Sequence, residues 1–312
     1  MRVLITDHVH ELLIENLISS SYQVDYYPDI DNQYIKSIIH QYHVVVINTR
    51  TPFNREMIDM SKSLRLIVRL GSGLDIIDCE YADQKGIHVC NTPEGNRQAV
   101  AEHALGLLLG LLNRIVISNE QVKSLTWRRE ENRGIEIEGK TLGIIGFGNT
   151  GSSFAKLLSG FNLKILAYDK YKQRFAENYR NVIETDMTEI FRNCDVLSLH
   201  IPLTSETVHL CDMNFFKRFE KDIFLLNTSR GKIIKTSDLI SCIRSGKIKG
   251  AALDVLENEN PGSYNGNEKL MYEQLFSFSN VIVTPHIAGW SVESKEKIAE
   301  LTYKCIIQYA PV

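Results

Sequence analysis

The sequence predicts an α/β protein made of two doubly wound parallel sheets, with one domain inserted into the other. Short apolar runs alternate with helical segments along the chain, as buried parallel strands alternate with their crossovers. One such series is complete before residue 100, and a glycine-rich turn starts a second series near the middle of the chain. A length of 312 residues is enough for two separate cores.

The first series begins at the N-terminus. Residues 3–6 form an apolar strand, and residues 11–19 carry leucine and isoleucine at helical spacing. Residues 44–47 and 66–68 are further apolar runs typical of buried strands. Because this βαβ pattern precedes the glycine-rich turn, the domain that holds the turn is expected to be an insertion.

The glycine-rich turn places Gly146, Gly148 and Gly151 between an apolar strand at 141–145 and a helix. A strand at 164–168 follows and ends in Asp169, about 20 residues after the glycines, as dinucleotide-binding folds require. In such folds the pyrophosphate meets the free N–H groups and the positive end of the helix. An ordinary strand–turn–helix is the alternative. A carboxylate at Asp169 favours NAD over NADP, because it accepts ribose hydroxyls and repels a 2′-phosphate, although Lys170 and Lys172 could soften that repulsion.

The alternation resumes after Asp169. Further strands are expected at 196–199, 223–226, 250–253 and 281–283, and the tail at 292–309 is expected to be a helix that folds back onto the first domain. The apolar helix at 98–118 connects the domains, and its surplus of apolar residues suits either domain packing or a subunit interface. We therefore expect a substrate domain formed by residues 1–97 and 290–312 and a dinucleotide-binding domain formed by 98–289. The loop at 257–267, rich in Asn, Gly and Pro, is expected to be irregular or mobile.

Composition excludes several other classes of function. A net charge of -3 gives no electrostatic reason to bind nucleic acid or an anionic membrane. The apolar stretch at 104–112 is too short to span a membrane, and the N-terminus does not resemble a signal peptide.

None of the six cysteines forms a C-x-x-C pair, so we expect reduced core cysteines in a cytoplasmic protein.

Polar residues at the ends of the predicted strands are candidates for chemistry, because ligands of such sheets bind there. Arg230 presents a planar donor fork that suits a carboxylate, although a surface salt bridge is the alternative. His286 is a natural proton donor and acceptor, provided that a carboxylate orients its ring; otherwise it is structural. Glu257 and Glu259 are the candidate partners, and for both of them a solvated loop face is the alternative.

Several segments together resemble one family, the D-isomer-specific 2-hydroxyacid dehydrogenases. They include the Asn-Thr-Ser-Arg-Gly and Thr-Pro-His-Ile-Ala-Gly motifs, and they lie in family order at 69–75, 91–93, 100–103, 146–151, 200–204, 227–231, 251–255 and 284–289. The resemblance covers nearly the whole chain and is strongest to short phosphoglycerate dehydrogenases without a C-terminal regulatory domain. It implies a Rossmann NAD-binding domain inserted into a flavodoxin-like substrate domain. Serine feedback through a regulatory domain is not expected.

The resemblance also implies the site residues. Arg230 and His286 match the catalytic arginine and histidine, and Glu259, five positions beyond Asp254, matches the glutamate. Asn260 stands where the family usually has proline. The implied cofactor contacts are Gly146, Gly148, Asn149, Thr150, Gly151, Asp169, Ile201, Thr228, Asp254 and Gly289, and the implied substrate contacts are the backbone of Ser72 and Gly73 and the phosphate-binding arginines Arg50, Arg69 and Arg129.

The implied activity is NAD-dependent oxidation of D-3-phosphoglycerate, a reaction of serine biosynthesis, by a homodimer. The same chemistry on glyoxylate, hydroxypyruvate or another unphosphorylated acid is the alternative. Formate oxidation is disfavoured, because formate enzymes of this superfamily carry glutamine where Glu259 stands. A non-catalytic, NAD-sensing corepressor is a more remote alternative, since a fold does not by itself establish an activity.

Overall fold

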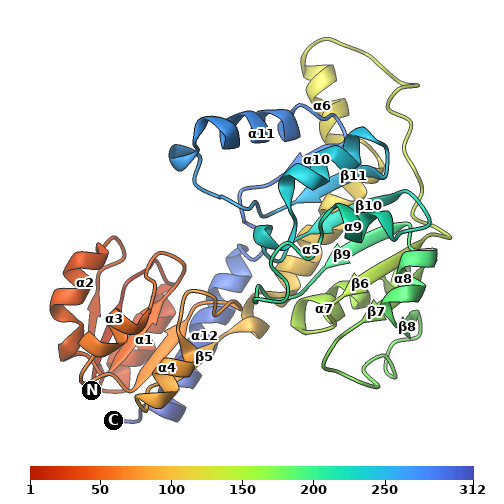
Figure 1. Ribbon diagram of the computed structural model, residues 1–312. Coiled ribbons are helices and arrows are strands. Elements are labelled where there is room, and N and C mark those ends of the chain that lie inside the picture. The colour runs from red at the N-terminus through yellow and green to blue at the C-terminus, as the bar shows by residue number, and fades with distance from the viewer. The chain divides into compact units, whose positions relative to one another are not determined.

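The computed structural model describes residues 1–312, which divide into two compact units. Unit 1 comprises Met1–Gln98 and Gly289–Val312, and unit 2 comprises Ala99–Ala288. The boundary between the units falls within helix α5, Pro93–Leu112. Figure 1 shows the elements of both units coloured along the chain.

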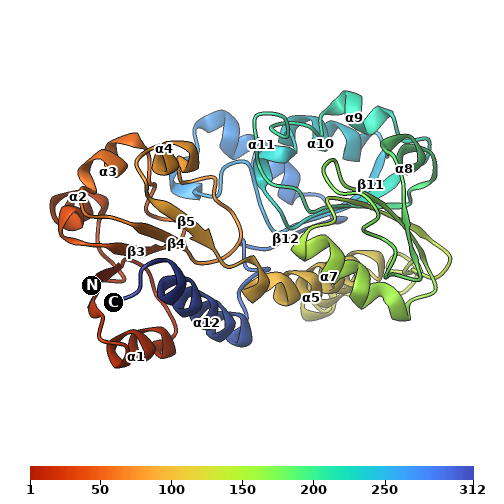
Figure 2. The same ribbon diagram turned by 90° about the horizontal axis from the view of Figure 1, so that it is seen from below.

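Unit 1 is a five-stranded parallel sheet with strand order β2-β1-β3-β4-β5, the flavodoxin-like order, which confirms the predicted fold class. Its strands are β1 (Arg2–Ile5), β2 (Gln23–Tyr26), β3 (Val44–Ile47), β4 (Leu66–Arg69) and β5 (His88–Asn91). Helices α1 (Glu11–Ser19) and α12 (Val292–Tyr309) cover one face of the sheet (Figure 2). The other face packs against α2 (Asn32–Ile38), α3 (Arg55–Met60) and α4 (Cys79–Gln84).

Unit 2 is a seven-stranded parallel sheet with strand order β12-β11-β10-β9-β6-β7-β8. Counted within the unit, this is the Rossmann order with one further strand at the edge, as predicted. The strands are β6 (Thr141–Ile145), β7 (Lys164–Tyr168), β8 (Val182–Glu184), β9 (Val196–Leu199), β10 (Ile223–Asn227), β11 (Ile248–Leu253) and β12 (Val281–Val283). The helices are α5, α6 (Ile115–Lys123), α7 (Asn149–Leu157), α8 (Met187–Asn193), α9 (Met213–Lys217), α10 (Thr236–Arg244) and α11 (Gly266–Phe276).

Sequence reasoning missed three strands, β2, β5 and β8, and all three lie at sheet edges. Their side chains are only partly buried, so none of them is a continuous apolar run. The predicted helix at 98–118 is in fact two helices, because Arg114 adopts a left-handed backbone with φ 53° between α5 and α6.

The expectation that all cysteines are reduced is wrong for one pair. Cys90 in β5 and Cys305 in α12 form a disulfide, with Cα atoms 6.9 Å apart and a sequence separation of 215 positions. No spacing pattern predicts a pair that only the packing of α12 brings together. The other four cysteines are free, and burial raises the pKa of Cys194 to about 12.

No single helix of the protein combines the length and apolar character needed to cross a membrane. Only α5 and α6 taken together pass that test, and they are bent by 63° where they meet.

Candidate active site

Three loops at the carboxyl ends of neighbouring strands in the unit 2 sheet hold the polar residues that the sequence singles out. Strands β10, β11 and β12 are parallel neighbours, so their carboxyl ends lie at the same edge. Arg230 follows β10, Asp254 and Glu259 follow β11, and His286 follows β12. Open α/β sheets bind ligands beyond such strand ends, which makes this edge the candidate active site.

Asn227, the last residue of β10, shapes the turn that presents Arg230. Its Nδ2 donates to the carbonyl oxygen of Arg230 at 2.9 Å, and its Oδ1 accepts from the N–H and the hydroxyl of Ser229 at 3.0 and 2.7 Å. A Cβ on Gly231 would overlap the carbonyl oxygen of Leu256. Glycine therefore lets the Arg230 turn pack directly against the loop that follows β11.

Asp254 is a buried carboxylate, 1% exposed, that organises the loop carrying the histidine. Its Oδ1 accepts from the hydroxyl of Thr284 at 2.6 Å and from the N–H of Ile287 at 2.9 Å, and its Oδ2 accepts from the N–H of Ala288 at 2.8 Å. The carbonyl oxygen of Asp254 accepts the N–H of His286 at 2.8 Å. This frame holds His286 in a left-handed backbone with φ 54°, a conformation that costs a residue with a Cβ roughly 1–2 kcal/mol.

His286 and Glu259 form a hydrogen-bonded pair at this end of the sheet. The imidazole Nδ1 lies 2.8 Å from Oε2 of the glutamate, and the two side chains are 38% and 42% exposed. A carboxylate at this distance keeps the ring hydrogen on Nδ1, which leaves Nε2 available to a ligand. The pair therefore has the geometry of an oriented histidine that can exchange a proton.

Glu257, the other glutamate that the sequence left open, has different partners. Its Oε2 lies 2.7 Å from Nε2 of His209, and its Oε1 accepts the N–H of Thr236, the first residue of α10, at 2.6 Å. Glu257 thus links two loops to a helix N-terminus, and the structure pairs Glu259, not Glu257, with His286.

The loop that carries Glu259 is more ordered than the irregular segment expected over 257–267. The N–H of Asn258 donates to the hydroxyl of Tyr272 at 2.9 Å, and its carbonyl accepts from the hydroxyl of Tyr264 at 3.0 Å. Asn260 caps a 3₁₀ turn, η4 (Pro261–Ser263), and α11 already begins at Gly266. Proline suits the first position of such a turn, because no hydrogen bond is lost there. Asn260, which stands where the family usually has proline, therefore serves as the cap of this turn, and Pro261 takes its first position.

The glycine turn after β6 has the shape that a pyrophosphate requires. Gly146 has φ 91°, and a Cβ on it would overlap the carbonyl oxygen of His200. A Cβ on Gly151 would overlap the carbonyl oxygen of Gly146, so α7 packs closely on the strand. No heavy atom lies within 4 Å of a Cβ placed on Gly148, which leaves an open approach to the backbone.

The other residues implied as cofactor contacts differ in their surroundings. Asn149 and Thr150 are the first residues of α7, where helix N–H groups lack internal partners. Ile201 packs against Gly146. The hydroxyl of Thr228, just after β10, is buried without a hydrogen-bond partner, which is unusual for a buried polar atom and suits a ligand group. The open face of Gly148 and this hydroxyl both fit a dinucleotide. Gly289 belongs to unit 1.

His200, whose carbonyl oxygen lies against Gly146, is a neutral histidine. Its Nε2 shares a hydrogen bond of 2.8 Å with the hydroxyl of Ser198, and its N–H donates to the carbonyl of Ile145. Burial lowers the pKa of the His200 imidazole to about 4. It is therefore a packing residue of the fold.

Asp169 follows β7 and caps the same turn. Its Oδ2 accepts the N–H of Phe147 at 2.9 Å, and its Oδ1 accepts the N–H groups of Tyr171 and Lys172 at 3.0 and 3.1 Å. Lys170 pairs with Glu206, and the ammonium of Lys172 donates to the carbonyl of Phe147 at 3.1 Å. Glu206 thus compensates the charge of Lys170, whereas the ammonium of Lys172 stays at the turn that Asp169 caps.

The implied substrate contacts of unit 1 lie at the carboxyl ends of β3 and β4. The hydroxyl of Ser72 donates to Oδ1 of Asn96 at 3.1 Å, and its carbonyl accepts Nδ2 of Asn91 at 2.6 Å. The N–H groups of Ser72 and Gly73 donate to no backbone carbonyl. Side-chain contacts therefore hold this loop and leave both N–H groups available.

The implied phosphate-binding arginines differ in their surroundings. Arg50 follows β3, and its Nε donates at 3.1 Å to Asp7, a carboxylate 5% exposed, so its charge is compensated within unit 1. Arg69 ends β4, and its Nη1 donates to the carbonyl of Leu70 at 2.7 Å. Arg129 is exposed in unit 2, on the segment after α6.

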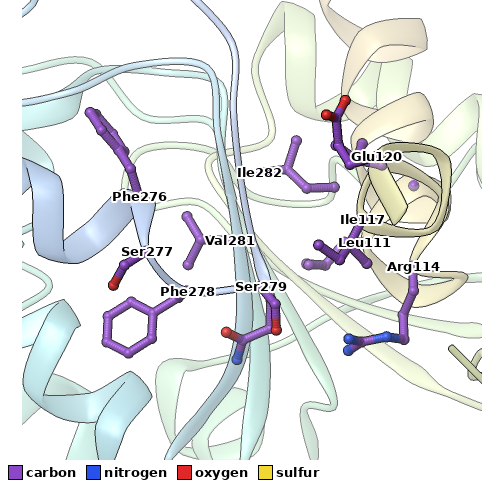
Figure 3. A pocket seen from close by; sticks show the side chains of 13 residues that line it. Leu111, Arg114, Ile117, Glu120, Phe276, Ser277, Phe278, Ser279, Val281 and Ile282 are labelled. Carbon is purple, nitrogen blue, oxygen red and sulfur yellow. The ribbon is translucent and has the colours of Figure 1, made fainter. Parts of the chain in front are cut away.

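A cavity of about 230 Å³ lies beside the amino end of β12 (Figure 3). It is lined by the C-terminal end of α5, by α6 and by the segment that leads into β12, including Arg114, Phe276 and Val281. The cavity lies where β12 begins, at Val281, whereas His286 lies beyond the end of that strand. The cavity is therefore separate from the candidate active site.

Sequence reasoning overlooked residues that build this site without touching its chemistry. Asn227, Thr284 and His103 all lie in the motifs that carried the family resemblance, yet none had a role assigned. Asn227 and Thr284 are polar residues at strand ends, a signal that could have identified them, whereas His103 lies within α5 and carries no such signal.

The fold and this site define a class, the two-domain NAD-binding oxidoreductases built from doubly wound sheets. Residues 105–288 match the family described as D-isomer specific 2-hydroxyacid dehydrogenase, NAD binding domain. The chain belongs to the D-isomer-specific 2-hydroxyacid dehydrogenase family, and its cofactor is NAD.

Relatives with different substrates resemble the chain to a similar degree. It is 31% identical, over 99% of its length, to a D-3-phosphoglycerate dehydrogenase of Archaeoglobus fulgidus, and it spans 57% of that protein. It is 35% identical, over 86% of its length, to a hydroxypyruvate reductase of Thermotoga maritima, with 85% of that protein covered. A D-lactate dehydrogenase of Aquifex aeolicus, solved with NAD and lactic acid, superposes with a TM-score of 0.85 and 28% identity, covering 98% of this chain and 94% of that one.

Replacing Asp169 tests its proposed contact with the adenine ribose. We expect Asp169→Ser to reduce the ratio of NADH to NADPH affinity by about tenfold, because repulsion of the 2′-phosphate is lost. Titration of both nucleotides by fluorescence measures the ratio, and Asp186→Ser, which removes a helix-capping carboxylate elsewhere in unit 2, is the matched control. An unchanged ratio would show that Asp169 does not read the ribose.

Proposed function

We propose that the protein is an NAD-dependent dehydrogenase that oxidises D-3-phosphoglycerate at C2 to 3-phosphohydroxypyruvate. The observation that carries the proposal is the hydrogen bond between Glu259 and His286, at the strand edge that also bears Arg230. A cation and an oriented histidine at the same end of the sheet suit a substrate that has a carboxylate next to a hydroxyl group.

Each side chain has a distinct task in this proposal. The guanidinium of Arg230 holds the substrate carboxylate and polarises the oxygen on C2. Nε2 of His286 accepts the hydroxyl proton during oxidation and returns it during reduction. Glu259 orients the ring and stabilises the imidazolium that forms. Bound NAD supplies the acceptor for the hydride that leaves C2.

The cofactor contacts are part of the proposal. The backbone of Gly146, Gly148 and Gly151 and the N-terminus of α7 would hold the pyrophosphate. Asp169 would bind the adenine ribose, and the free hydroxyl of Thr228 would satisfy a further cofactor group. The N–H groups of Ser72 and Gly73 would bind the substrate carboxylate.

The phosphorylated substrate is supported by two features. By the family resemblance, Arg50, Arg69 and Arg129 would be the phosphate-binding arginines. D-3-phosphoglycerate dehydrogenases of Archaeoglobus fulgidus and Synechocystis match 99% and 96% of this chain. A phosphate dianion needs such cations in addition to the carboxylate clamp.

Reduction of hydroxypyruvate or glyoxylate is the second candidate, and Arg50 favours it. An arginine already paired with a buried carboxylate at Asp7 offers less attraction to a phosphate than a solvated one does. The hydroxypyruvate reductase of Thermotoga maritima also matches this chain over 86% of its length.

The proposed working form is a homodimer. Apolar side chains of α6 and the following segment are exposed, among them Val122 at 48%, Leu125 at 97% and Trp127 at 77%. Exposed apolar surface of this kind marks a protein interface. Sedimentation velocity is expected to give twice the mass of one chain, and a monomer at micromolar concentration would refute the dimer.

Kinetics with paired substrates separate the two candidates. We expect kcat/KM with NAD to be at least about tenfold higher for D-3-phosphoglycerate than for D-glycerate, because only the former has a phosphate for the phosphate-binding arginines. Arg129→Gln should lower the value for the phosphorylated acid alone, whereas Arg133→Gln, a neighbouring exposed arginine paired with Glu130, should leave both unchanged.

Equal values for the two acids, with faster reduction of hydroxypyruvate or glyoxylate, would establish the second candidate. Tight NAD binding without turnover of any D-2-hydroxy acid would favour a non-catalytic NAD sensor.

Single substitutions test the acid–base pair. His286→Ala should lower turnover by about 10²-fold or more while NADH affinity changes little, since a positioned acid–base group contributes 10²–10⁴-fold. Glu259→Gln should also lower turnover, whereas Glu257→Gln, which alters the pair with His209, should mainly affect stability. Turnover of the two glutamine variants should therefore differ. A greater loss of turnover in Glu257→Gln would contradict the assignment of Glu259.

A further inference from the structure

Thr284 and His103 form a hydrogen-bonded chain that ends on the buried carboxylate of Asp254. The hydroxyl of Thr284 lies 2.6 Å from Oδ1 of Asp254, and Nε2 of His103, in α5, lies 3.0 Å from the same hydroxyl. His103 Nε2 is also 3.5 Å from Oδ1 of Asp254. All three residues belong to unit 2.

Chemistry fixes the direction of this chain. A carboxylate only accepts, so Thr284 donates its single hydroxyl hydrogen to Asp254. The hydroxyl oxygen then has only lone pairs to offer to His103, so the imidazole carries a hydrogen on Nε2. The order is therefore His103 to Thr284 to Asp254, and each donor is used once.

The end of this chain is the frame of the catalytic loop. The carboxylate that accepts from Thr284 also accepts the N–H groups of Ile287 and Ala288, which immediately follow His286. Those bonds hold His286 at φ 54°, a strained conformation that persists only where its surroundings impose it. If the Asp254 carboxylate rotated, the N–H groups of Ile287 and Ala288 would lose their acceptor, and the backbone of His286 could relax from its strained conformation.

We propose that Thr284 and His103 are positioning residues, which fix the carboxylate of Asp254 and thereby set the direction in which His286 presents Nε2. The inference rests on the proposed function for its effect on turnover but not for its effect on the loop. Neither residue touches the reacting atoms in this account. Their contribution is the orientation of the proton-transfer group.

The test compares Thr284→Val, which keeps the shape of the side chain and removes the hydroxyl, with Thr284→Ser, which restores it. Hydrogen exchange at the amides of Ile287 and Ala288 reports the loop, and kcat and KM for the best 2-oxo acid report the reaction. Thr302→Val is the matched control, because the hydroxyl of Thr302 is buried without a partner in α12.

We expect Thr284→Val to raise amide exchange at both positions by about tenfold and to lower kcat by about tenfold or more, as small misplacements of reacting groups do. Thr284→Ser should return both values to within about twofold of the parent protein. His103→Leu should act in the same direction as Thr284→Val, and His103→Gln, whose amide can donate from a similar position, should restore both values.

If Thr284→Val and Thr302→Val have the same amide exchange rates at Ile287 and Ala288 and the same kcat, the inference is wrong. This holds whether or not the melting temperature of Thr284→Val falls. If the parent protein reduces no 2-oxo acid, the proposed function fails, and amide exchange alone then decides whether Thr284 and His103 hold the loop.

Discussion

The buried carboxylate of Asp254 is the constraint on which the candidate active site depends. It lies at the end of β11 and accepts three hydrogen bonds from the segment after β12, so it joins the ends of two neighbouring strands. A carboxylate left without these donors would be costly to bury, and a histidine left without this frame would relax from its left-handed backbone. The observed hydrogen bonds avoid the first cost, because they give the buried carboxylate its donors. The same bonds compensate the backbone strain at His286, because they hold the loop in place.

Adjacent packing extends this frame to the other catalytic candidates. Gly231 allows the Arg230 turn to touch the loop after β11, and Asn258, Tyr264 and Tyr272 hold the part of that loop that bears Glu259. Residues from three strand ends therefore share one rigid support. Glu257, anchored to His209 and the N-terminus of α10, stiffens the same loop from the opposite side. Hydride transfer benefits from such fixed positions, because the hydride leaves C2 while the proton leaves the oxygen bonded to C2, and the groups around both atoms must stay in place.

Much of this architecture could be predicted from sequence, and its limits have physical causes. Central strands were recognised because burial on both faces makes them continuous apolar runs, whereas the edge strands β2, β5 and β8 lack that pattern. Arg230, Asp254 and His286 could be selected because strand ends concentrate ligand chemistry. The residue types alone left Glu257 and Glu259 open, and only the family resemblance favoured Glu259, which the structure pairs with His286. The disulfide between Cys90 and Cys305 depends on the docking of α12, so local sequence could not predict it. Thr284 and His103 act through Asp254, and only coordinates show such indirect roles.

The central claim is that Arg230 and the His286–Glu259 pair bind and convert a 2-hydroxy or 2-oxo acid together. A crystal structure with NAD and oxamate, an unreactive analogue of a 2-oxo acid, tests it most directly. We expect the oxamate carboxylate to lie on the guanidinium of Arg230 and its carbonyl oxygen to lie within hydrogen-bond distance of Nε2 of His286, with Glu259 still on Nδ1. If oxamate binds away from Arg230, or if the His286 ring is turned from the ligand while NAD is in place, the two side chains do not act on one substrate together.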